Sequence, residues 1–187
     1  MDPSEEAKTR ELANELLALR CQRGERAAWE ELVAAFERPL HYYLRRLLAR
    51  EEDALAVLQD TWVRVFSSLP ALREPARLAP WLYSLARHAW LTHIGLREAD
   101  RLEFSGLEEG PEPEDPGAIE DDAQAVHWGL EKLAAPQREL LTLFFLRDLS
   151  LREIAQVLDI PVGTVKSRLS KARAELRSVL ERTESMR

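Results

Sequence analysis

The segment beginning at Ser150 constrains the fold of this chain most. Ser150 opens the sequence SLRE, in which the Ser side chain can cap the backbone N–H of Glu153 while Glu153 reaches back to the backbone of Ser150, a pairing typical of a helix N-terminus. A tight turn at residues 159–162 stops this helix, and a longer one begins near residue 163 or 164 and runs to about residue 181. Two helices joined by a short turn are typical of helix-turn-helix DNA-binding proteins.

The second of these helices has two opposite faces. Its apolar residues fall within a narrow arc that must face the preceding helices: Val165, Leu169, Ala172 and Leu176. The opposite arc carries Ser167, Ser170, Lys171 and Arg177, with Lys166, Arg168 and Arg173 at its flanks. Such a face can enter a major groove, with polar groups at base edges and cations at phosphates. A solvated basic face is the alternative, but the capped helix and the short turn ahead of it favour DNA binding.

The charge of the chain is distributed unevenly. The formal net charge is −7, which is unusual for a nucleic-acid-binding protein. However, residues 102–125 contain nine acidic residues and no basic ones, whereas residues 164–182 contain six basic and two acidic residues. Local patches govern attraction to phosphate, so the acidic total does not exclude DNA binding.

The composition predicts an all-α protein. Among 187 residues there are only seven glycines, and the β-branched residues never form alternating runs. In the first half we expect about four helices ending near residue 97, at 11–22, 25–50, 52–69 and 81–97. Pro39 should kink or split the second of them.

The third predicted helix carries an apolar stripe with helical spacing. Its members are Leu55, Leu58, Trp62, Val65 and Leu69. This stripe is most simply part of the core. The segment 70–80 that follows contains three prolines and is expected to be a loop or a very short helix.

An acidic segment divides the chain into two parts. It contains GPEPEDPG, where proline and like charges preclude a packed core and predict a flexible linker. After it we expect a short helix at 126–133 and another that opens at Pro136 and continues through the apolar run LLTLFFL. The predicted organisation is therefore two small helical domains, 1–99 and 126–187, joined by an acidic flexible linker at 100–125, with the helix-turn-helix in the second domain.

The sequence argues against an enzyme or a metal protein. Cys21 is the only cysteine, His88 and His93 stand five residues apart rather than on one helical face, and no glycine-rich phosphate loop is present. We expect no catalytic residue, no metal and no cofactor. The charged N-terminus lacks the apolar core of a signal peptide and no apolar run is long enough to cross a bilayer, which favours a cytoplasmic protein without membrane insertion.

The second domain resembles region 4 of the extracytoplasmic-function sigma factors of the sigma-70 family. The resemblance rests on LAAPQRELLTLFFLRDLSLREIAQVLDIPVGTVKSRLSKARAELRSVL, which follows the family pattern with few departures. It implies that the −35 element of a promoter is contacted by Thr164, Lys166, Ser167, Arg168, Ser170, Lys171 and, nearer the backbone, Arg173. It also implies docking on the flap of the RNA polymerase β subunit, although the sequence does not mark the residues involved.

The first domain is similar to region 2 of the same family. The similarity rests on AAWEELVAAFERPLHYYLRRLL, DALAVLQDTWVRVF and APWLYSLARHAW. It implies that this domain binds the β′ clamp of core RNA polymerase and opens the −10 element. By position, Gln59 and Asp60 match the polar pair that the family uses on the polymerase, with Leu55 and Trp62 beside them. For Leu55 and Trp62, the core stripe described above is the alternative.

The first domain departs from the family pattern where promoter opening is concerned. Ala56 and Thr92 each stand where Asp is usual, and His88 stands where Asn is usual. The loop at 70–80 would hold a flipped base of the −10 element, yet it contains no aromatic residue for stacking. Candidate −10 contacts are Arg73, Arg77, Trp81, Arg87 and His88. Tyr83 and Trp90 are further candidates for stacking, although aromatic residues at such spacing are more often core.

The function predicted from these resemblances is that of a sigma factor, a protein without catalytic residues of its own. Its implied partners are core RNA polymerase, promoter DNA and an anti-sigma factor, and it is expected to be a monomer when free. One alternative is a sigma-like regulator that binds DNA or an anti-sigma factor without initiating transcription. Another is a helix-turn-helix repressor, which would normally dimerise to read a palindrome.

Overall fold

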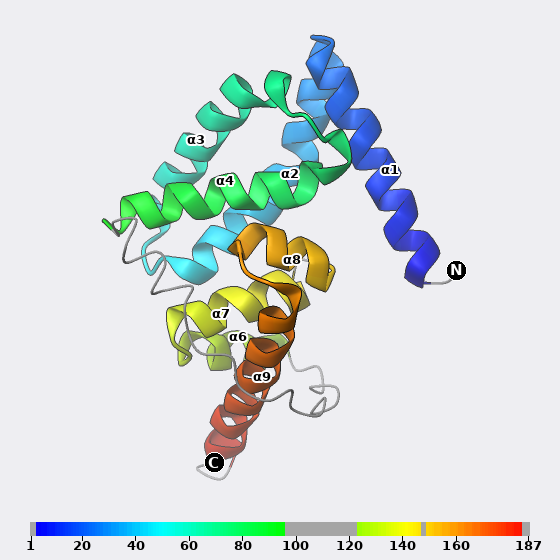
Figure 1. The fold of residues 1–187 in the computed structure, drawn as a ribbon. Helices are drawn as coiled ribbons and strands as arrows, with labels where there is room; N and C mark the ends of the chain where they lie inside the picture. The colour runs from blue at the N-terminus through cyan, green and yellow to red at the C-terminus, as the bar shows by residue number, and fades with distance from the viewer. Residues whose placement is uncertain (1–2, 96–122, 147–148, 185–187) are drawn as a thin grey trace. The chain divides into compact units, whose positions relative to one another are not determined.

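The chain folds into two compact groups of helices (Figure 1). The computed structural model describes residues 3–95, 123–146 and 149–184. Unit 1 comprises Met1–Arg45 and Arg50–Gly95, and unit 2 comprises Leu96–Arg187 together with Arg46–Ala49. All regular elements within the described ranges are helical, which confirms the predicted all-α class. The predicted linker at 100–125 lies outside the described residues except for 123–125, which already belong to a helix.

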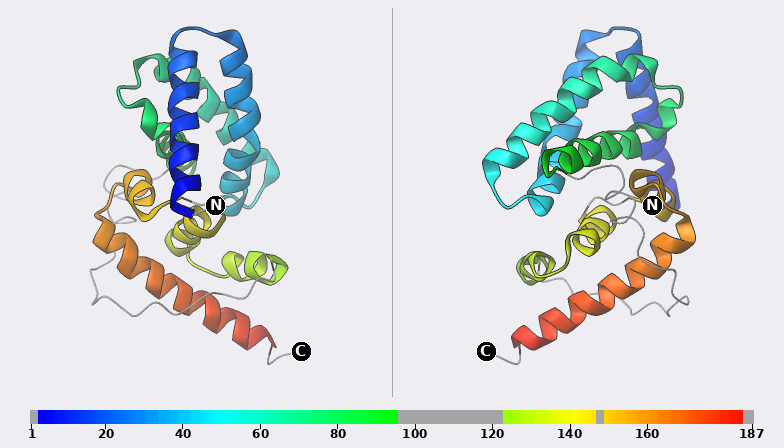
Figure 2. Two further views of the ribbon diagram at one scale, coloured as in Figure 1. Left: turned by 90° about the vertical axis from the view of Figure 1, so that its right-hand side faces the viewer. Right: turned by 60° about the vertical axis from the view of Figure 1, so that its left-hand side comes forward.

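Unit 1 is built from longer helices joined by short turns. Its elements are α1 (Pro3–Gln22), α2 (Arg26–Leu47), α3 (Glu51–Ser68), η1 (Leu69–Ala71), η2 (Pro75–Arg77) and α4 (Leu78–His93). Figure 2 shows α1 and α2 running side by side in opposite directions. Gly24 makes the tight turn between them with φ of +79°, a conformation that costs glycine little. Pro39 lies inside α2 and does not split it.

The core of unit 1 collects the apolar faces of α2, α3 and α4. Leu40 and Tyr43 of α2 are fully buried, as is Val65 of α3. The Tyr43 ring meets Tyr83 of α4 edge-on, with 5.4 Å between the ring centroids. Trp90 of α4 is only 1% exposed. Tyr83 and Trp90 are therefore core residues, which was the favoured interpretation of both, and they are not available for DNA.

In unit 2, shorter helices pack against one long helix. Its elements are α6 (Ala123–Glu131), α7 (Ala135–Leu141), the π-helical turn η3 (Thr142–Leu146), α8 (Leu151–Leu158) and α9 (Val162–Glu184). The helices α6, α7 and α8 all contact α9. The approach of α6 is especially close, because a Cβ atom added at Gly129 would lie 2.6 Å from Leu176 Cδ1. Within the run LLTLFFL that was predicted to be buried, residues 140–143 are buried, whereas Phe144 is half-buried.

The helix-turn-helix forms where the sequence predicted it. Ser150 Oγ accepts a hydrogen bond from the backbone N–H of Glu153 at 3.3 Å, and Glu153 Oε2 accepts one from the Ser150 N–H at 2.9 Å. At the other end of α8, Asp159 adopts the left-handed conformation with φ of 54° and leads the chain into the turn. The capping box and the turn therefore fix where α8 begins and where α9 leaves it.

Candidate nucleic-acid interface

The inner face of α9 is buried in the core of unit 2. Val165, Leu169, Ala172 and Leu176 are all buried, which confirms the predicted arc. The remaining surface of α9 includes Lys166 and Lys171, which are exposed, and Ser170, which is half-buried between them. This arrangement presents two cations and a hydroxyl on the first half of the helix, the part that reaches base edges in helix-turn-helix complexes.

Thr164 and Ser167 do not lie on this open surface. Thr164 is 6% exposed and Ser167 is 5% exposed. The Ser167 hydroxyl donates a hydrogen bond to the backbone carbonyl of Thr164 at 3.1 Å. The prediction that Ser167 lies on the outward arc is therefore wrong, because α8 packs against α9 at this end of the helix.

Arg168 and Arg173 are held partly within the domain. Burial lowers the pKa of Arg168 from its ordinary value. The guanidinium of Arg173 lies over the ring of Phe144 in η3, 4.8 Å from its centroid, a cation–π contact. Both side chains are half-buried. Their aliphatic stems pack against the domain, and both residues lie next to the exposed residues of α9 in sequence.

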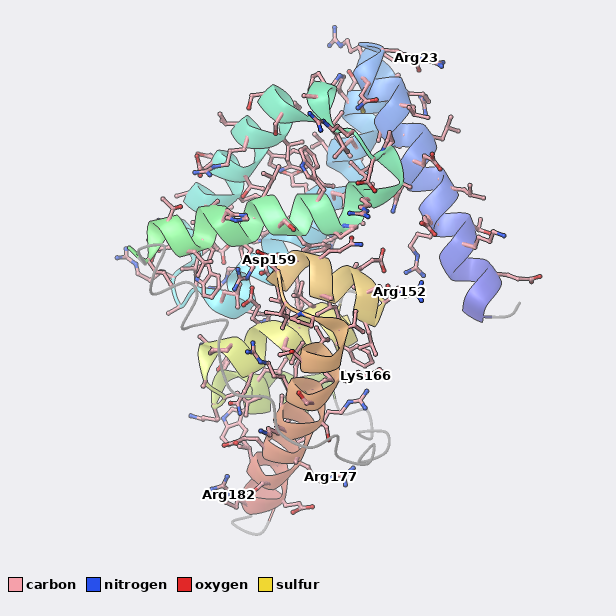
Figure 3. All side chains as sticks on the ribbon, in the orientation of Figure 1. Arg23, Arg152, Asp159, Lys166, Arg177 and Arg182 are labelled. Atoms are coloured by element: carbon pink, nitrogen blue, oxygen red, sulfur yellow. The ribbon has the colours of Figure 1, made fainter. Side chains whose placement is uncertain are left out.

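Basic side chains also extend the surface beyond α9. Figure 3 shows Arg152 projecting from α8, and Lys166 and Arg177 projecting from one side of α9, whereas Arg182 projects from another side. Arg152 is exposed in the first turn of α8. Sequence reasoning did not single it out, although the first helix of such a motif crosses the DNA backbone and a cation there is well placed for a phosphate.

Unit 1 exposes an apolar face on α3. Leu55 is 45% exposed, Val63 66% and Phe66 48%. With the exposed Gln59, they follow helical spacing along one side of α3, and we call these four residues the α3 outer face. The Phe66 ring also contacts Trp29 of α2, with 5.2 Å between the ring centroids. The sequence did not single out Val63, Phe66 or Trp29, because the predicted apolar stripe follows the neighbouring side of α3 and shares only Leu55 with this face.

The apolar stripe predicted on this helix is core with one exception. Leu58, Trp62, Val65 and Leu69 are buried, but Leu55 is not, because it lies at the edge of the buried arc. Trp62 is 9% exposed and its ring lies 5.8 Å from that of Phe66 between centroids. Asp60 is exposed and accepts an ion-pair contact from Arg64, 2.9 Å from Nε to Oδ2.

The loop between α3 and α4 carries the candidate −10 contacts. Arg73 and Arg77 are exposed, and Arg77 forms an ion pair with Glu74, 2.8 Å from Nε to Oε2. Trp81, in the first turn of α4, is half-buried. Arg87 is only 6% exposed. The prediction that its side chain contacts the −10 element from the surface is therefore corrected.

His88 lies on the exposed side of α4. Its Nδ1 donates a hydrogen bond to the backbone carbonyl of Ser84 at 2.7 Å. Thr92, one turn further on, is also exposed and donates to the His88 carbonyl at 2.8 Å. The substitutions noted at these two positions, like that at the exposed Ala56, are therefore surface changes that leave the core intact.

Comparison with known proteins matches both units to one family. The family model described as Sigma-70 region 2 matches residues 32–99, and the model described as Sigma-70, region 4 matches residues 124–176. The ECF RNA polymerase sigma-E factor of Escherichia coli (strain K12) is 30% identical over 176 residues, which cover 87% of this chain and 92% of the relative. The chain belongs to the extracytoplasmic-function sigma factors.

Other sigma factors show the same relationship in sequence and in fold. The ECF RNA polymerase sigma factor SigW of Bacillus subtilis (strain 168) is 25% identical over 172 residues, covering 85% of this sigma factor and 92% of SigW. The structure of CnrH in complex with the cytosolic domain of CnrY matches with a TM-score of 0.68 and 27% identity, covering 91% of this chain and 98% of CnrH. The sigma factor RpoE, in complex with the anti-sigma factor NepR from Bartonella quintana, shares the fold with a TM-score of 0.63 and 22% identity. The match covers 82% of this chain and 96% of the solved chain.

The described ranges of this sigma factor hold neither a metal-binding cluster nor a membrane-spanning helix. At residues 3–95, 123–146 and 149–184, no cluster of three or more His, Cys, Asp or Glu side chains is arranged to hold a metal ion. No helix in the same ranges combines the length and the apolar character that crossing a membrane requires.

Proposed function

We propose that this sigma factor directs promoter-specific initiation through two surfaces of contrasting chemistry, one on each unit. The observation that carries the proposal is that α3 exposes an apolar face around Gln59 in unit 1, while α8 and α9 expose Lys166, Lys171 and Arg152 in unit 2. An exposed apolar patch marks a protein interface, and a basic helix-turn-helix face suits DNA. The division of labour follows the units: residues 1–99 engage polymerase and the −10 element, and residues 126–187 engage the −35 element, with 100–125 as the connecting segment.

The α3 outer face is proposed to bind the β′ clamp of core RNA polymerase. Its three apolar side chains each leave a third or more of their surface in water, which is unfavourable unless a partner covers them. Phe66, backed by Trp29, offers a large preorganised ring of the kind that dominates interface energetics. Gln59 supplies hydrogen-bonding groups among these apolar side chains, and Asp60 lies beside Gln59. Trp62 supports the face from below rather than forming its exposed part.

The exposed part of α9 is proposed to read the −35 element. Lys166, Ser170 and Lys171 supply donors for base edges, and Arg168 and Arg173 supply phosphate contacts from their packed positions. Arg152 of α8 adds a phosphate contact on the other side of the turn. Thr164 and Ser167, being buried, act through the backbone at the start of α9 or by fixing its position.

The loop between α3 and α4 is proposed to open the −10 element. Arg73 is exposed in this loop, and Trp81 and His88 lie further along on α4. Trp81 offers a partly exposed ring for a base, in place of the aromatic residue that the loop itself lacks. Arg77 contributes less charge to DNA than Arg73 because Glu74 neutralises it.

The remaining features of the proposal concern partners and setting. The protein acts without a cofactor and without catalytic residues, because phosphodiester chemistry belongs to the polymerase, and it works in the cytoplasm as a monomer when free. An anti-sigma factor is a further partner. The solved relative CnrH forms a complex with the cytosolic domain of CnrY, which supports a protein partner besides the polymerase for this chain too.

A sigma-like regulator that does not initiate transcription is the second candidate. It is favoured by Ala56, His88 and Thr92, which replace usual family residues at exposed positions on α3 and α4. An alanine at position 56 removes a carboxylate from the surface beside Gln59, which would weaken contact with a basic polymerase partner. Measured binding to core polymerase therefore discriminates between the two functions.

The test compares substitutions at Gln59 of the α3 outer face and at the neighbouring Asp60 with a matched control. Replacing Gln59 and Asp60 together by Ala should lower the affinity for core RNA polymerase about tenfold, which corresponds to a joint loss of about 1.4 kcal/mol for two truncated contact residues. Glu30→Ala is the control, because Glu30 is an exposed acid on α2 that also pairs with an arginine four residues away. Affinity can be measured by fluorescence anisotropy of the labelled full-length protein.

Binding of the unit 2 surface to a −35 DNA fragment should be unchanged in the same double variant. Equal core affinity for the double variant and Glu30→Ala would remove Gln59 and Asp60 from the polymerase interface. Absence of core binding by the unsubstituted protein would favour the sigma-like regulator.

A further inference from the structure

Gln22, the last residue of α1, holds a loop that lies far from it in sequence. Its Nε2 donates hydrogen bonds to the backbone carbonyls of Leu69 at 3.2 Å and Leu72 at 2.7 Å. These acceptors lie 47 and 50 residues further along the chain, in the loop that joins α3 to α4. Figure 1 shows this loop passing against α1, and η1 and η2 both contact α1.

The loop packs on α1 through η1 and η2, but few hydrogen bonds fix its backbone. Leu69 at its start and Leu78 at its end are fully buried, but Arg73 and Arg77 between them are exposed. Its backbone hydrogen bonds are local, from the Leu72 N–H to the Leu69 carbonyl at 3.0 Å and from the Arg77 N–H to the Glu74 carbonyl at 2.9 Å. Neither of these connects the loop to another helix, whereas the two bonds from Gln22 do.

Contacts at the turn between α1 and α2 fix the position of Gln22. Just before it, Arg20 pairs with Glu25 at 2.9 Å and with Glu31 of α2 at 2.7 Å, and these hydrogen bonds raise the pKa of Arg20. Just after it, the turn at Gly24 closes with a bond from the Gly24 N–H to the Cys21 carbonyl at 2.9 Å. The end of α1 is thus fixed against α2, and the amide of Gln22 transmits that position to the loop.

We propose that Gln22 is a positioning residue for promoter opening, which acts by holding the loop from Leu69 to Arg77 in the conformation that receives a base of the −10 element. The proposal rests on the role assigned above to this loop. Preorganisation is the physical reason: a loop already held in its binding conformation loses less entropy when it captures an unpaired base. Segment α1 thereby takes part in −10 recognition without touching DNA.

Three substitutions separate this role from simple folding. Gln22→Leu keeps the approximate size and removes the donor, and Gln22→Glu replaces the donor by an acceptor that faces two carbonyl oxygens. Gln22→Lys restores a donor and is the rescue variant. All three should fold, because α1 stays docked through the buried side chains of Leu17, Ala18 and Cys21. Glu11→Ala, at an exposed position on α1, is the control.

Amide hydrogen exchange of the free full-length protein tests the structural half of the proposal. Peptides that cover residues 69–78 should exchange about tenfold faster in Gln22→Leu and Gln22→Glu, as expected when a part-buried hydrogen bond worth about 1.4 kcal/mol is lost. Gln22→Lys and Glu11→Ala should exchange as the unsubstituted protein does. Unchanged exchange in Gln22→Leu, or exchange that rises equally throughout α3 and α4, overturns the proposal.

Open-complex formation tests the functional half. With core RNA polymerase and a promoter that the unsubstituted protein opens, permanganate reactivity of −10 thymines should fall about tenfold for Gln22→Leu and Gln22→Glu and less than twofold for Gln22→Lys. Affinity for core polymerase should not change. A normal permanganate pattern for Gln22→Leu overturns the proposal while leaving the sigma-factor function standing. If the unsubstituted protein opens no promoter, the proposed function fails, and the exchange experiment still decides whether Gln22 holds the loop.

Discussion

Lys171 and Ser167 are four residues apart on α9, yet only Lys171 is exposed and available to a partner. Lys171 is exposed, whereas the Ser167 hydroxyl is turned inward onto the Thr164 carbonyl. Helical periodicity alone predicts that both side chains lie on the outward arc. The helix α8 covers this end of α9. The spacing of residues along a single helix cannot predict such a contact between two helices.

Replacing Lys171 by Ala should weaken binding to the −35 element and leave core polymerase binding intact. Loss of one phosphate or base contact is expected to reduce affinity by roughly 1–3 kcal/mol if a base edge is involved, and to lower the salt slope by about 1 if a phosphate is involved. Binding to duplex −35 DNA over a range of salt concentrations measures both. Arg182→Ala is the matched control, because Arg182 projects from another side of α9 (Figure 3).

A result in which the Lys171 and Arg182 variants bind −35 DNA equally would show that α9 meets DNA through another face. A loss of core polymerase binding in the Lys171 variant would contradict the division of labour between the two units.

At the scale of elements, the capping box on α8 links a local sequence pattern to the DNA-reading surface. Ser150→Ala removes the side-chain acceptor for the Glu153 N–H, which should cost about 1 kcal/mol of stability. For a domain of this size, that corresponds to a fall in Tm of about 4–8 °C for the transition of unit 2. Differential scanning calorimetry of the full-length protein measures the change.

Ser67→Ala provides a comparison within a helix end that has no capping box. The Ser67 hydroxyl donates to the Arg64 carbonyl near the end of α3, so its loss should change Tm much less. Equal effects of the two substitutions would mean that the capping box contributes nothing special to the position of α8.

The elements themselves were largely predictable because their signals are local. The helical spacing of α3, the SLRE box and the proline-rich segment at 70–80 each depend on residues close in sequence. What the local signals missed are the contacts that join distant segments, such as the bonds from Gln22 to Leu69 and Leu72. The interruption expected at Pro39 was also wrong in its stronger form, because α2 continues through that residue.

For the whole molecule, the net charge of −7 conceals two surfaces with different chemistry. The α3 outer face is apolar, and the exposed part of α8 and α9 is basic. The part of the basic surface on α9 was visible in the sequence as an excess of basic over acidic residues at 164–182. The apolar one was not, because Val63 and Phe66 look like core residues until the structure shows which side of α3 is covered.

Run-off transcription with purified core RNA polymerase and a library of promoter fragments from the protein's own genome tests the central claim most directly. The account predicts specific transcripts that start downstream of two shared, spaced elements and that require both the protein and the core enzyme. Core binding without any specific transcript, or no core binding at all, would contradict it and would identify the chain as a sigma-like regulator.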